Sequence, residues 1–472
     1  MSILQKYFNP LYLTIFIIIW FVSCSPNHIL LENSGKTLLK KKINNLLIEA
    51  QLNASIGIDI RSLKSGTSIY SYQKNKPLTP ASNSKIYTSG AALMYLGLDY
   101  KFKTIIYSKG NNLFIKGNGD PNFSLNNLDS LAKLVSLSFE TIDTLIADES
   151  TFDSNQFGPG WMWDEGHWWH AAPVNALILN DNCVDFFIQP KTIGEPINLE
   201  IIPNTRYIKV INNSYTVSDS LNLKKFSINR DWRNQTNNFT ILGNKVQSSL
   251  IDTLKRNIHN PALFTATIFA ERLSHYKVPI KHIKTGKTHR SATPHFKHLS
   301  KSLLQINQNM MHESDNLTAE VLTKTIGSLD SIPGNWKTGL KTIKSILADS
   351  AKMDTNDMKL ADGSGLSRYN LSSAQNFTHF LDYIYQSQYR DSFVSSMPFG
   401  GSEGTLKERL IEIGPDIRAK TGSLSGVNCL SGYIFSKRYG PLAFSILING
   451  YTGSSLPYKQ LQDKIVTLLR NY

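Results

Sequence analysis

Cysteine is scarce in this chain, and so are the motifs that use it. The 472 residues include three cysteines, with no Cys-x-x-Cys pair and no His-Glu-x-x-His motif. This scarcity argues against a cysteine-bound metal and a zinc-peptidase centre, so we predict no metal and no cofactor. Spacing alone does not say whether Cys183 and Cys429 pair, and we expect both to be small buried apolar residues in strands.

Acidic residues are outnumbered by basic ones. The chain has 36 Asp and Glu against 50 Lys and Arg, which gives a formal net charge of +14. Such a balance suits nucleic acid, an anionic envelope surface or acidic substrates. The basic residues are scattered, however, and the densest group, Lys40 to Lys42, lies on a predicted amphipathic helix. We therefore predict a solvated basic surface and no nucleic-acid partner.

An apolar run near the N-terminus is too short to cross a bilayer. It covers 12 residues, Leu11–Val22, against the ~20 that a spanning helix needs, and it matches the apolar core of a signal peptide. The sequence Phe21-Val22-Ser23-Cys24 resembles a bacterial lipoprotein processing site, although Phe21 stands where an aliphatic residue is usual. We predict a signal peptide over 1–23, export to the periplasm, and a lipid anchor on Cys24. An ordinary cleaved signal or a retained anchor is the alternative.

The rest of the chain has a globular composition, with 41% hydrophobic and 18% charged residues. Alternating apolar residues predict a hairpin over 54–73, and a helical pattern follows from Ser82. Short β-like runs dominate 98–261, helices dominate 262–388, and three strands and a helix end the chain. We predict one domain, 35–97 plus 262–472, with an antiparallel sheet flanked by helices, split by a β-rich insertion over 98–261.

Three short motifs carry the chemical signal: Ser-x-x-Lys, Ser-Asp-Asn and Lys-Thr-Gly. Each is weak alone, because Ser-x-x-Lys also begins at Ser71 and Ser274, and Lys-Thr-Gly also begins at Lys284 and Lys337. Ser71 falls in a predicted strand and Ser274 ends a predicted helix. The two extra Lys-Thr-Gly copies lie in a predicted loop and at the start of a helix. Context therefore favours the Ser-x-x-Lys copy at Ser82, which opens a helix.

Ser82 and Lys85 share one helical face, so the lysine amine can lie beside the serine hydroxyl. A serine hydroxyl needs a base to become a good nucleophile. A lysine can be that base only if burial or nearby positive charge lowers its pKa. We interpret Ser82 as a nucleophile and Lys85 as its base. Considered alone, these residues favour the alternative, a helix cap at Ser82 beside a solvated Lys85.

The other two motifs supply polar groups suited to a peptide substrate. Ser314-Asp315-Asn316 lies between two predicted helices and can present Ser314 as a proton relay and Asn316 as a hydrogen-bond partner of the substrate backbone. Helix capping by Asp315 or Asn316 is the alternative. Lys420, Thr421 and Ser423 lie on a predicted strand, whose edge can pair with an extended peptide while these side chains hold a carboxylate.

In chain order the three motifs resemble the set of penicillin-binding proteins and serine β-lactamases. Further segments resemble the low-molecular-mass class C penicillin-binding proteins, the D-alanyl-D-alanine carboxypeptidases/endopeptidases of the penicillin-binding protein 4 type. These segments are Pro80–Lys85, Gly117–Pro121, Leu145–Asp153, Gly158–Trp161, Asn180–Asp185, Met311–Asn316, Asp362–Arg368, Gly400–Leu406 and Ala419–Tyr433. The resemblance covers nearly all of the chain after the signal peptide. The long interval between Ser82 and Ser314 exceeds the room in a simple β-lactamase.

The resemblance implies an α+β fold, a penicillin-recognising transpeptidase-like domain split by the insertion. It implies a serine D,D-peptidase that acts on peptidoglycan stem peptides or cross-links and is acylated on Ser82 by β-lactam antibiotics. In this reading Ser314, Asn316, Lys420, Thr421 and Ser423 complete the cleft, and the backbone N–H groups of Ser82 and Ser423 hold the oxyanion. A β-lactamase or esterase on the same scaffold is the alternative enzyme, and a catalytically idle wall-binding scaffold is the non-enzymatic one.

Several residues outside the motifs have more than one interpretation. The resemblance implies that Asp148 contacts the side-chain amine of a cell-wall diamino acid, with loop capping as the alternative. Arg368 is expected near the substrate, or else as a solvated side chain. Four tryptophans cluster at 161–169 and predict packing between insertion and main domain, with a saccharide platform as the alternative. His167 and His170 have helical metal-ligand spacing, but we do not expect a metal there.

Overall fold

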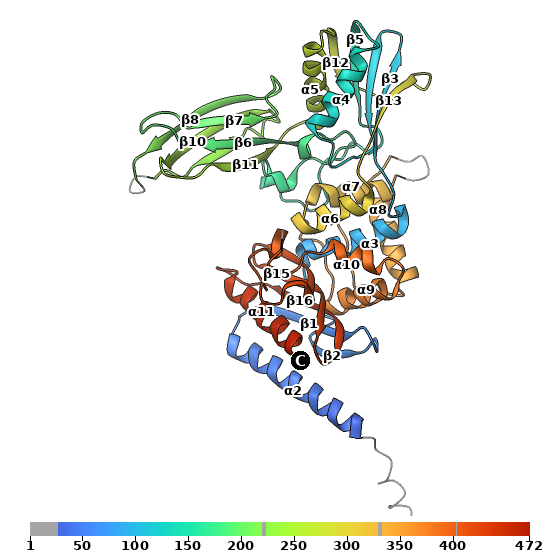
Figure 1. Ribbon diagram of the computed structural model, residues 1–472, viewed down its shortest axis with the longest axis vertical. Helices are drawn as coiled ribbons and strands as arrows, with labels where there is room; N and C mark the ends of the chain where they lie inside the picture. The colour runs from blue at the N-terminus through green and yellow to red at the C-terminus, as the bar shows by residue number, and fades with distance from the viewer. Residues whose placement is uncertain (1–26, 220–222, 329–332, 403) are drawn as a thin grey trace, which may run out of the picture.

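The computed structural model describes residues 27–219, 223–328, 333–402 and 404–472 (Figure 1). The predicted signal peptide and Cys24 lie outside the described residues. No helix in the described ranges is long and apolar enough to cross a membrane. Cys183 and Cys429 are both free and buried in strands, as expected.

A five-stranded antiparallel sheet in the order β14-β15-β16-β1-β2 is the base of the main domain. Its strands are β1 (Ser55–Ser62), β2 (Ser68–Tyr72), β14 (Ile417–Leu424), β15 (Val427–Ser436) and β16 (Gly440–Asn449). The N-terminal hairpin and the three C-terminal strands predicted from the sequence are confirmed. Strands from the two ends of the chain are hydrogen-bonded side by side, because β1 pairs with β16 along its whole length.

Helices cover both faces of this sheet. One face packs against α2 (Asn27–Ala50) and α11 (Leu456–Asn471). The other faces a group of helices, α3 (Lys85–Leu96), α6 (Leu303–Glu313), α7 (Asn316–Ile326), α8 (Trp336–Ser345), α9 (Ala374–Gln386) and α10 (Arg390–Ser396). Side chains of a strand alternate between faces, so Ala443 and Leu447 join one core while Phe444 and Ile446 join the other. The predicted α+β class is confirmed.

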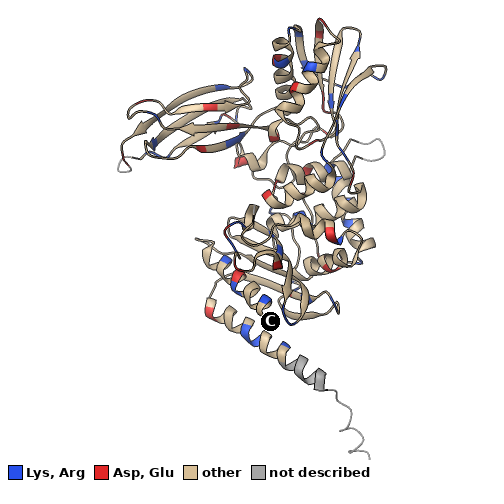
Figure 2. Ribbon diagram, in the orientation of Figure 1, with Lys and Arg blue, Asp and Glu red and all other residues tan. Residues whose placement is uncertain are grey.

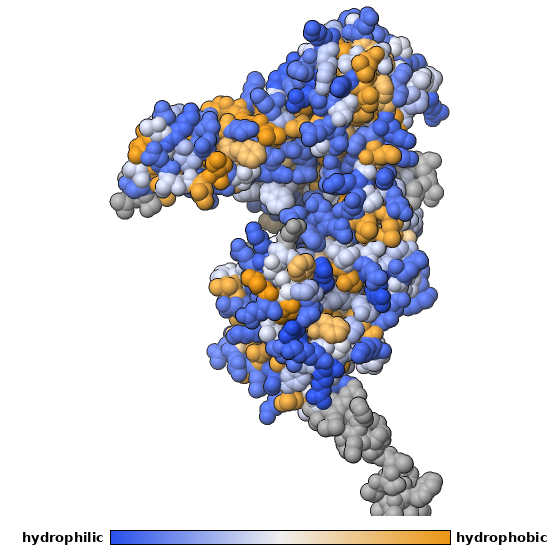
Figure 3. All heavy atoms as spheres, in the orientation of Figure 1, coloured by the Kyte–Doolittle hydropathy of each residue, from blue (hydrophilic) through white to orange (hydrophobic). Residues whose placement is uncertain are grey.

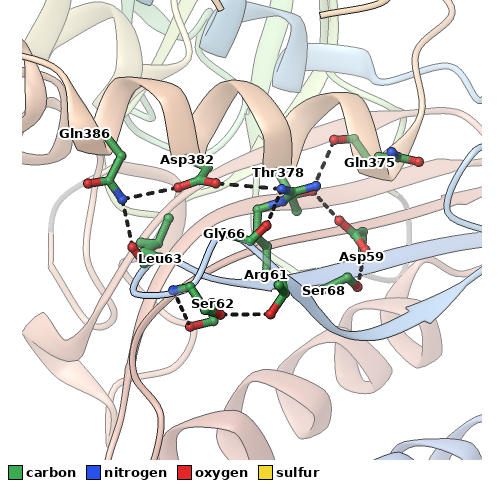
Figure 4. A network of polar contacts seen from close by, with 12 residues as sticks. Asp59, Arg61, Ser62, Leu63, Gly66, Ser68, Gln375, Thr378, Asp382 and Gln386 are labelled. Carbon is green, nitrogen blue, oxygen red and sulfur yellow. Dashed lines mark hydrogen bonds and ion pairs between the residues drawn. The ribbon is translucent and has the colours of Figure 1, made fainter. Parts of the chain in front are cut away.

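Buried polar contacts fix α9 across the first hairpin (Figure 4). Asp59 on β1 has no exposed surface, and its carboxylate accepts hydrogen bonds from Ser68 Oγ at 2.7 Å and from Thr378 Oγ1. Gln386 Nε2 donates to the Leu63 carbonyl oxygen at 2.7 Å. A buried carboxylate is costly unless it is hydrogen-bonded. These contacts therefore favour one position of α9 on the sheet.

The inserted region begins with a second five-stranded sheet, in the order β12-β5-β4-β3-β13. Its strands are β3 (Lys103–Lys109), β4 (Asn112–Gly117), β5 (Ile142–Asp148), β12 (Ile280–Thr285) and β13 (Thr293–Leu299). Two helices share its apolar core, α4 (Leu125–Ser136) and α5 (Pro261–His275).

This sheet corrects the predicted boundary at residue 262. Strand β12 pairs with β5 and β13 pairs with β3, so the inserted region continues to Leu299, and the main domain resumes with α6. The apolar pattern of α5 predicts a helix but does not say which core the helix joins. The helix α4 is also a departure from the strands expected over 98–261.

The remaining strands form a projecting subdomain (Figure 1). They are β6 (Cys183–Gln189), β7 (Asn198–Ile202), β8 (Lys209–Val217), β9 (Ser227–Arg230), β10 (Asn238–Val246) and β11 (Asp252–Asn257), arranged as two three-stranded sheets. Phe186 and Phe239 join the sheets, with ring centroids 5.2 Å apart. Figure 3 shows a hollow between this subdomain and the main domain.

Basic and acidic residues are dispersed over all the described parts of the chain (Figure 2).

Candidate active site

Ser82 and Lys85 meet at the start of α3. A short 3-10 turn, η1 (Ala81–Ser84), carries Ser82 directly into the helix that begins at Lys85. Lys85 Nζ lies 3.1 Å from Ser82 Oγ, 2.6 Å from Asn316 Oδ1 and 2.9 Å from the Ser364 carbonyl oxygen. The lysine has no exposed surface. The structure therefore brings hydroxyl and amine together, and two further oxygens from distant parts of the chain fix the position of the amine.

The turn that carries Ser82 is held in a strained, tightly packed conformation. Ala81 has φ +48°, in the left-handed region that non-glycine residues rarely adopt. A Cβ on Gly365, which has φ +86°, would lie 1.8 Å from the Ala81 carbonyl oxygen, and a Cβ on Gly422 would lie 2.6 Å from that of Pro80. Both glycines thus allow neighbouring segments to approach the turn.

Ser314 and Lys420 form the second polar pair of the site. Ser314 ends α6 with φ +59°, again in the left-handed region. Lys420 Nζ on β14 donates to Ser314 Oγ at 2.8 Å and to the Thr421 carbonyl oxygen at 2.9 Å. Strained residues of this kind cluster at functional sites. Between Ser314 and Asn316, Asp315 caps α7 by accepting from two backbone N–H groups, so the capping alternative holds for Asp315 and not for its neighbours.

The two lysines have pKa values that burial depresses. Burial lowers the pKa of Lys85 to about 8, although the negative charges of Asp315, Glu320 and Asp362 oppose the shift. Burial lowers the pKa of Lys420 well below its ordinary value, and the nearby charge of Lys85 lowers it further. A lysine with a pKa near the working pH can take and return a proton. Lys85 has the position and the pKa of a general base.

Two buried carboxylates, absent from the predicted site, hold the loop that carries Ser364. Glu320 on α7 accepts from the backbone N–H groups of Gly363 at 3.0 Å and Ser364 at 2.8 Å, and from Trp336 Nε1 at 2.7 Å. Burial, and then the charge of Asp362, raise the pKa of Glu320 to about 7. Glu320 is the single carboxylate of its helix, which also contains a lysine and three threonines. That pattern does not identify the partners of the charge.

Asp362 completes this support from within the loop. Its carboxylate accepts from the backbone N–H groups of Gly365 at 2.8 Å and Ser367 at 2.6 Å, and from Asn370 Nδ2 at 2.6 Å. Trp161 Nε1, from the inserted region, donates to the same carboxylate at 3.0 Å. The Ser364 carbonyl that contacts Lys85 is therefore positioned by two carboxylates and by the insertion.

A pocket of about 450 Å³ opens over these groups. Its lining includes Ser82, Ser314, Asn316, Arg368 and Ser423. Arg368 donates to the Ser425 carbonyl oxygen at 2.9 Å, which places its guanidinium at the pocket rim. The three motifs chosen from the sequence thus converge on one cavity.

The substrate contact expected of Asp148 is wrong for this structure. Asp148 ends β5 in the inserted region, has no exposed surface and does not line the pocket. It accepts from the backbone N–H groups of Ser150 at 2.9 Å and Thr288 at 2.7 Å, and Lys116 lies 3.7 Å away. Burial alone would raise its pKa, but the hydrogen bonds from Thr288 and Ser150 lower it. Asp148 is the loop-capping residue of the alternative interpretation.

Of the other residues discussed in the sequence analysis, some lie where they were expected and some do not. Trp161 packs against Trp336 of the main domain, as predicted, whereas Trp163 leaves 70% of its surface exposed. His170 is paired with Glu165 at 2.7 Å, and within the described ranges no group of three or more His, Cys, Asp or Glu side chains could hold a metal ion. The extra Lys-Thr-Gly copy at Lys284 ends strand β12 instead of lying in a loop, and it lies outside the pocket.

Comparison with known proteins agrees with this geometry. Residues 39–472 match the D-Ala-D-Ala carboxypeptidase 3 (S13) family. The chain belongs to this family. The similarity to penicillin-binding protein 4 inferred from the motifs is thereby confirmed.

Relatives of the S13 chain match it over nearly their whole length. A D-alanyl-D-alanine carboxypeptidase of an Actinomadura species is 29% identical, over 94% of this chain and 87% of the relative. The D-alanyl-D-alanine carboxypeptidase DacB of Haemophilus influenzae is 27% identical, over 92% and 94%. The crystal structure of penicillin binding protein 4 from H. influenzae superposes with a TM-score of 0.79 at 25% identity, covering 91% of this chain and 99% of that one.

Replacing the base should abolish most acylation of Ser82. Lys85→Met keeps the side-chain volume but removes the amine, and we expect acylation by an activated ester to slow by about 10²–10⁴-fold, the usual contribution of a general base. Intact-protein mass spectrometry measures the rate. Lys74→Met, in the extra Ser-x-x-Lys copy, is the matched control and should acylate normally.

In the wild type the rate of acylation should rise with pH up to about 8, where Lys85 loses its proton, and then level off. A pH-independent rate between pH 5 and 9 would contradict the role of Lys85.

Glu320→Gln should alter the active site although residue 320 does not line the pocket. One amide oxygen cannot replace two carboxylate oxygens, so we expect the free energy of unfolding to fall by about 1–3 kcal/mol. Loss of the negative charge disfavours the ammonium form of Lys85, so the midpoint of the pH–acylation profile should move to lower pH. The exposed Glu412→Gln provides the control for both measurements. An unchanged midpoint together with wild-type stability would exclude Glu320 as a positioning residue.

Proposed function

We propose that this S13 protein is an exported serine D,D-peptidase that hydrolyses D-alanyl-D-alanine-type bonds of peptidoglycan stem peptides or cross-links through an acyl-enzyme on Ser82. The observation that carries the proposal is the buried Lys85 amine 3.1 Å from the Ser82 hydroxyl. The family match, together with relatives named as D-alanyl-D-alanine carboxypeptidases, supplies the substrate class.

In the first half-reaction, neutral Lys85 takes the hydroxyl proton as Ser82 Oγ attacks the carbonyl carbon of the penultimate D-alanine. The negative charge on the tetrahedral intermediate is expected to be held by the backbone N–H groups of Ser82 and Ser423. Cleavage of the peptide bond leaves an ester on Ser82 and an amine that requires a proton. The Ser314 oxygen already accepts from Lys420, so its own hydrogen is free to be donated to the leaving amine. The proton that Lys85 took from Ser82 then passes to Ser314 in exchange, which leaves Lys85 neutral again.

In the second half-reaction, water attacks the ester carbonyl and gives its proton to Lys85. The bond to Ser82 Oγ breaks, and Lys85 returns that proton to the serine oxygen. Asn316 has a positioning role, because its Oδ1 accepts from Lys85 while its Nδ2 donates to the His170 carbonyl oxygen at 2.8 Å. Thr421, Ser423 and Arg368 are the side chains we assign to the substrate carboxylate. The formal net charge of +14 on the chain also suits a substrate that ends in that group.

Penicillins should acylate the same serine, because their strained amide presents a carbonyl to the same nucleophile. We expect fluorescent penicillin to label the wild type and Ser71→Ala equally, and to leave Ser82→Ala unlabelled. Ser71 belongs to the extra Ser-x-x-Lys copy, so Ser71→Ala shows whether a serine in any copy of this motif contributes to labelling. Purified wild type should also release D-alanine from stem pentapeptides, as measured by mass spectrometry. Labelled Ser82→Ala would refute the assignment, and rapid penicillin turnover without D-alanine release would favour the β-lactamase alternative.

Export and a lipid anchor on Cys24 belong to the same proposal. They are supported by the apolar run before Cys24 and by a substrate that lies outside the cytoplasm. Cys24→Ser should move the protein from the membrane fraction to the soluble fraction in cell fractionation, while penicillin labelling of Ser82 stays unchanged. Cys183→Ser, at a buried thiol, is the control and should remain in the membrane fraction. An identical distribution of wild type and Cys24→Ser would refute the lipid anchor.

A further inference from the structure

A second pocket, of about 400 Å³, adjoins the one over Ser82. Its walls come from the segment 156–171 of the inserted region and from the turn between β9 and β10 of the projecting subdomain. The two pockets share Met162 and Glu165 as lining residues, so they are direct neighbours. None of the three sequence motifs contributes to the second pocket, and the proposed reaction does not use it.

Aromatic rings dominate this pocket, and one of them is open to solvent. Trp163 and Trp232 lie with ring centroids 5.2 Å apart, and the Arg233 guanidinium lies 5.4 Å from each ring. Trp163 nevertheless leaves 70% of its surface exposed. A large exposed aromatic side chain within a pocket is a typical feature of a binding site. The predicted packing role of the tryptophan cluster accounts for Trp161 but not for Trp163.

Packing and hydrogen bonds hold two side chains of this pocket, Trp232 and Arg230. A Cβ on Gly166, which has φ +36°, would lie 2.5 Å from the Trp232 ring, so this ring packs directly on the backbone. Arg230 lines the pocket and is 5% exposed. It donates to the carbonyl oxygens of Thr236 at 2.9 Å and Gly166 at 3.2 Å, and to Asn257 Oδ1 at 2.9 Å. Its Nε has no hydrogen-bond acceptor among the described residues, which is unusual for a buried donor.

The lining suits a sugar. The flat, apolar C–H faces of a pyranose ring pack against indole rings, and its hydroxyl and acetamido groups need hydrogen-bond partners at the edge. Gln156 and Gln235 supply neutral amides at the pocket, and Arg233 supplies a donor. Stem peptides are attached to a glycan strand of N-acetylated amino sugars. A stem peptide that reaches Ser82 therefore brings such a sugar close to the enzyme.

We propose that the pocket between Trp163 and Trp232 is a subsite for an N-acetylated amino sugar of the glycan strand that carries the stem peptide. The inference rests on the proposed function for its choice of substrate, and it adds a contact that a free peptide cannot make. The enzyme should accordingly prefer sugar-bearing stem peptides over sugar-free ones.

The test compares two substrates and three variants. We expect wild type to release D-alanine from a disaccharide pentapeptide with a kcat/KM about five- to tenfold higher than from the free pentapeptide, as one aromatic contact can supply. Trp163→Ala should lose this preference while cleaving the free pentapeptide normally, and Trp163→Phe should keep part of it. Phe435→Ala removes an aromatic residue of similar exposure on β15 and should keep all of it. Equal rates on both substrates in wild type, or equal losses on both in Trp163→Ala, would overturn the proposal.

A binding measurement separates this inference from the proposed function. Titration with N,N′-diacetylchitobiose should change the intrinsic tryptophan fluorescence of wild type, with a dissociation constant on the order of 1 mM, and should leave Trp163→Ala unchanged. Absence of a change in wild type would overturn the sugar subsite even if D-alanine is released. If neither pentapeptide is cleaved, the proposed function fails, and the titration still decides whether the pocket binds a sugar.

Discussion

The chemistry of this molecule depends on one contact. The Lys85 amine, which is shielded from solvent, lies against the Ser82 hydroxyl. Burial favours the neutral amine, and three carboxylates nearby favour the charged one, so the pKa of Lys85 settles at about 8. Without those carboxylates the amine would be a weaker base, and with less burial it would stay protonated up to a higher pH. Either change would weaken proton transfer. The structure around Lys85 maintains this balance, in which burial has the larger effect.

Much of that structure could be predicted, because local patterns determine it. The strands and helices of the main domain follow from alternation and helical periodicity, and the convergence of three motifs follows from their order and context. What could not be predicted depends on pairing between distant segments. The periodicity of α5 is the same whether the helix packs on the main sheet or on the inserted one. Only the pairing of β12 with β5 decides the matter, and the boundary at residue 262 was misplaced for this reason.

Buried carboxylates show the same limit. Asp148 and Glu320 are both acidic residues without exposed surface, each holding two backbone N–H groups. They differ in the loop that each one holds. The loop held by Glu320 contacts Lys85, and the loop held by Asp148 lies in the inserted region. The resemblance assigned a substrate contact to Asp148 and was silent on Glu320. A residue type and its spacing do not identify the partner that justifies the burial of a charge, because that partner is a property of the fold.

The inserted region is part of the active site and not an appendage to it. The His170 carbonyl accepts from Asn316, and Trp161 donates to Asp362, so two groups that position Lys85 complete their hydrogen bonds with the insertion. A displacement of the segment 161–170 would leave a partly buried amide and a buried carboxylate short of partners, and both contact the surroundings of the base. The same segment lines the aromatic pocket. One short stretch of chain therefore contributes both to the hydrogen bonds around Lys85 and to the second pocket.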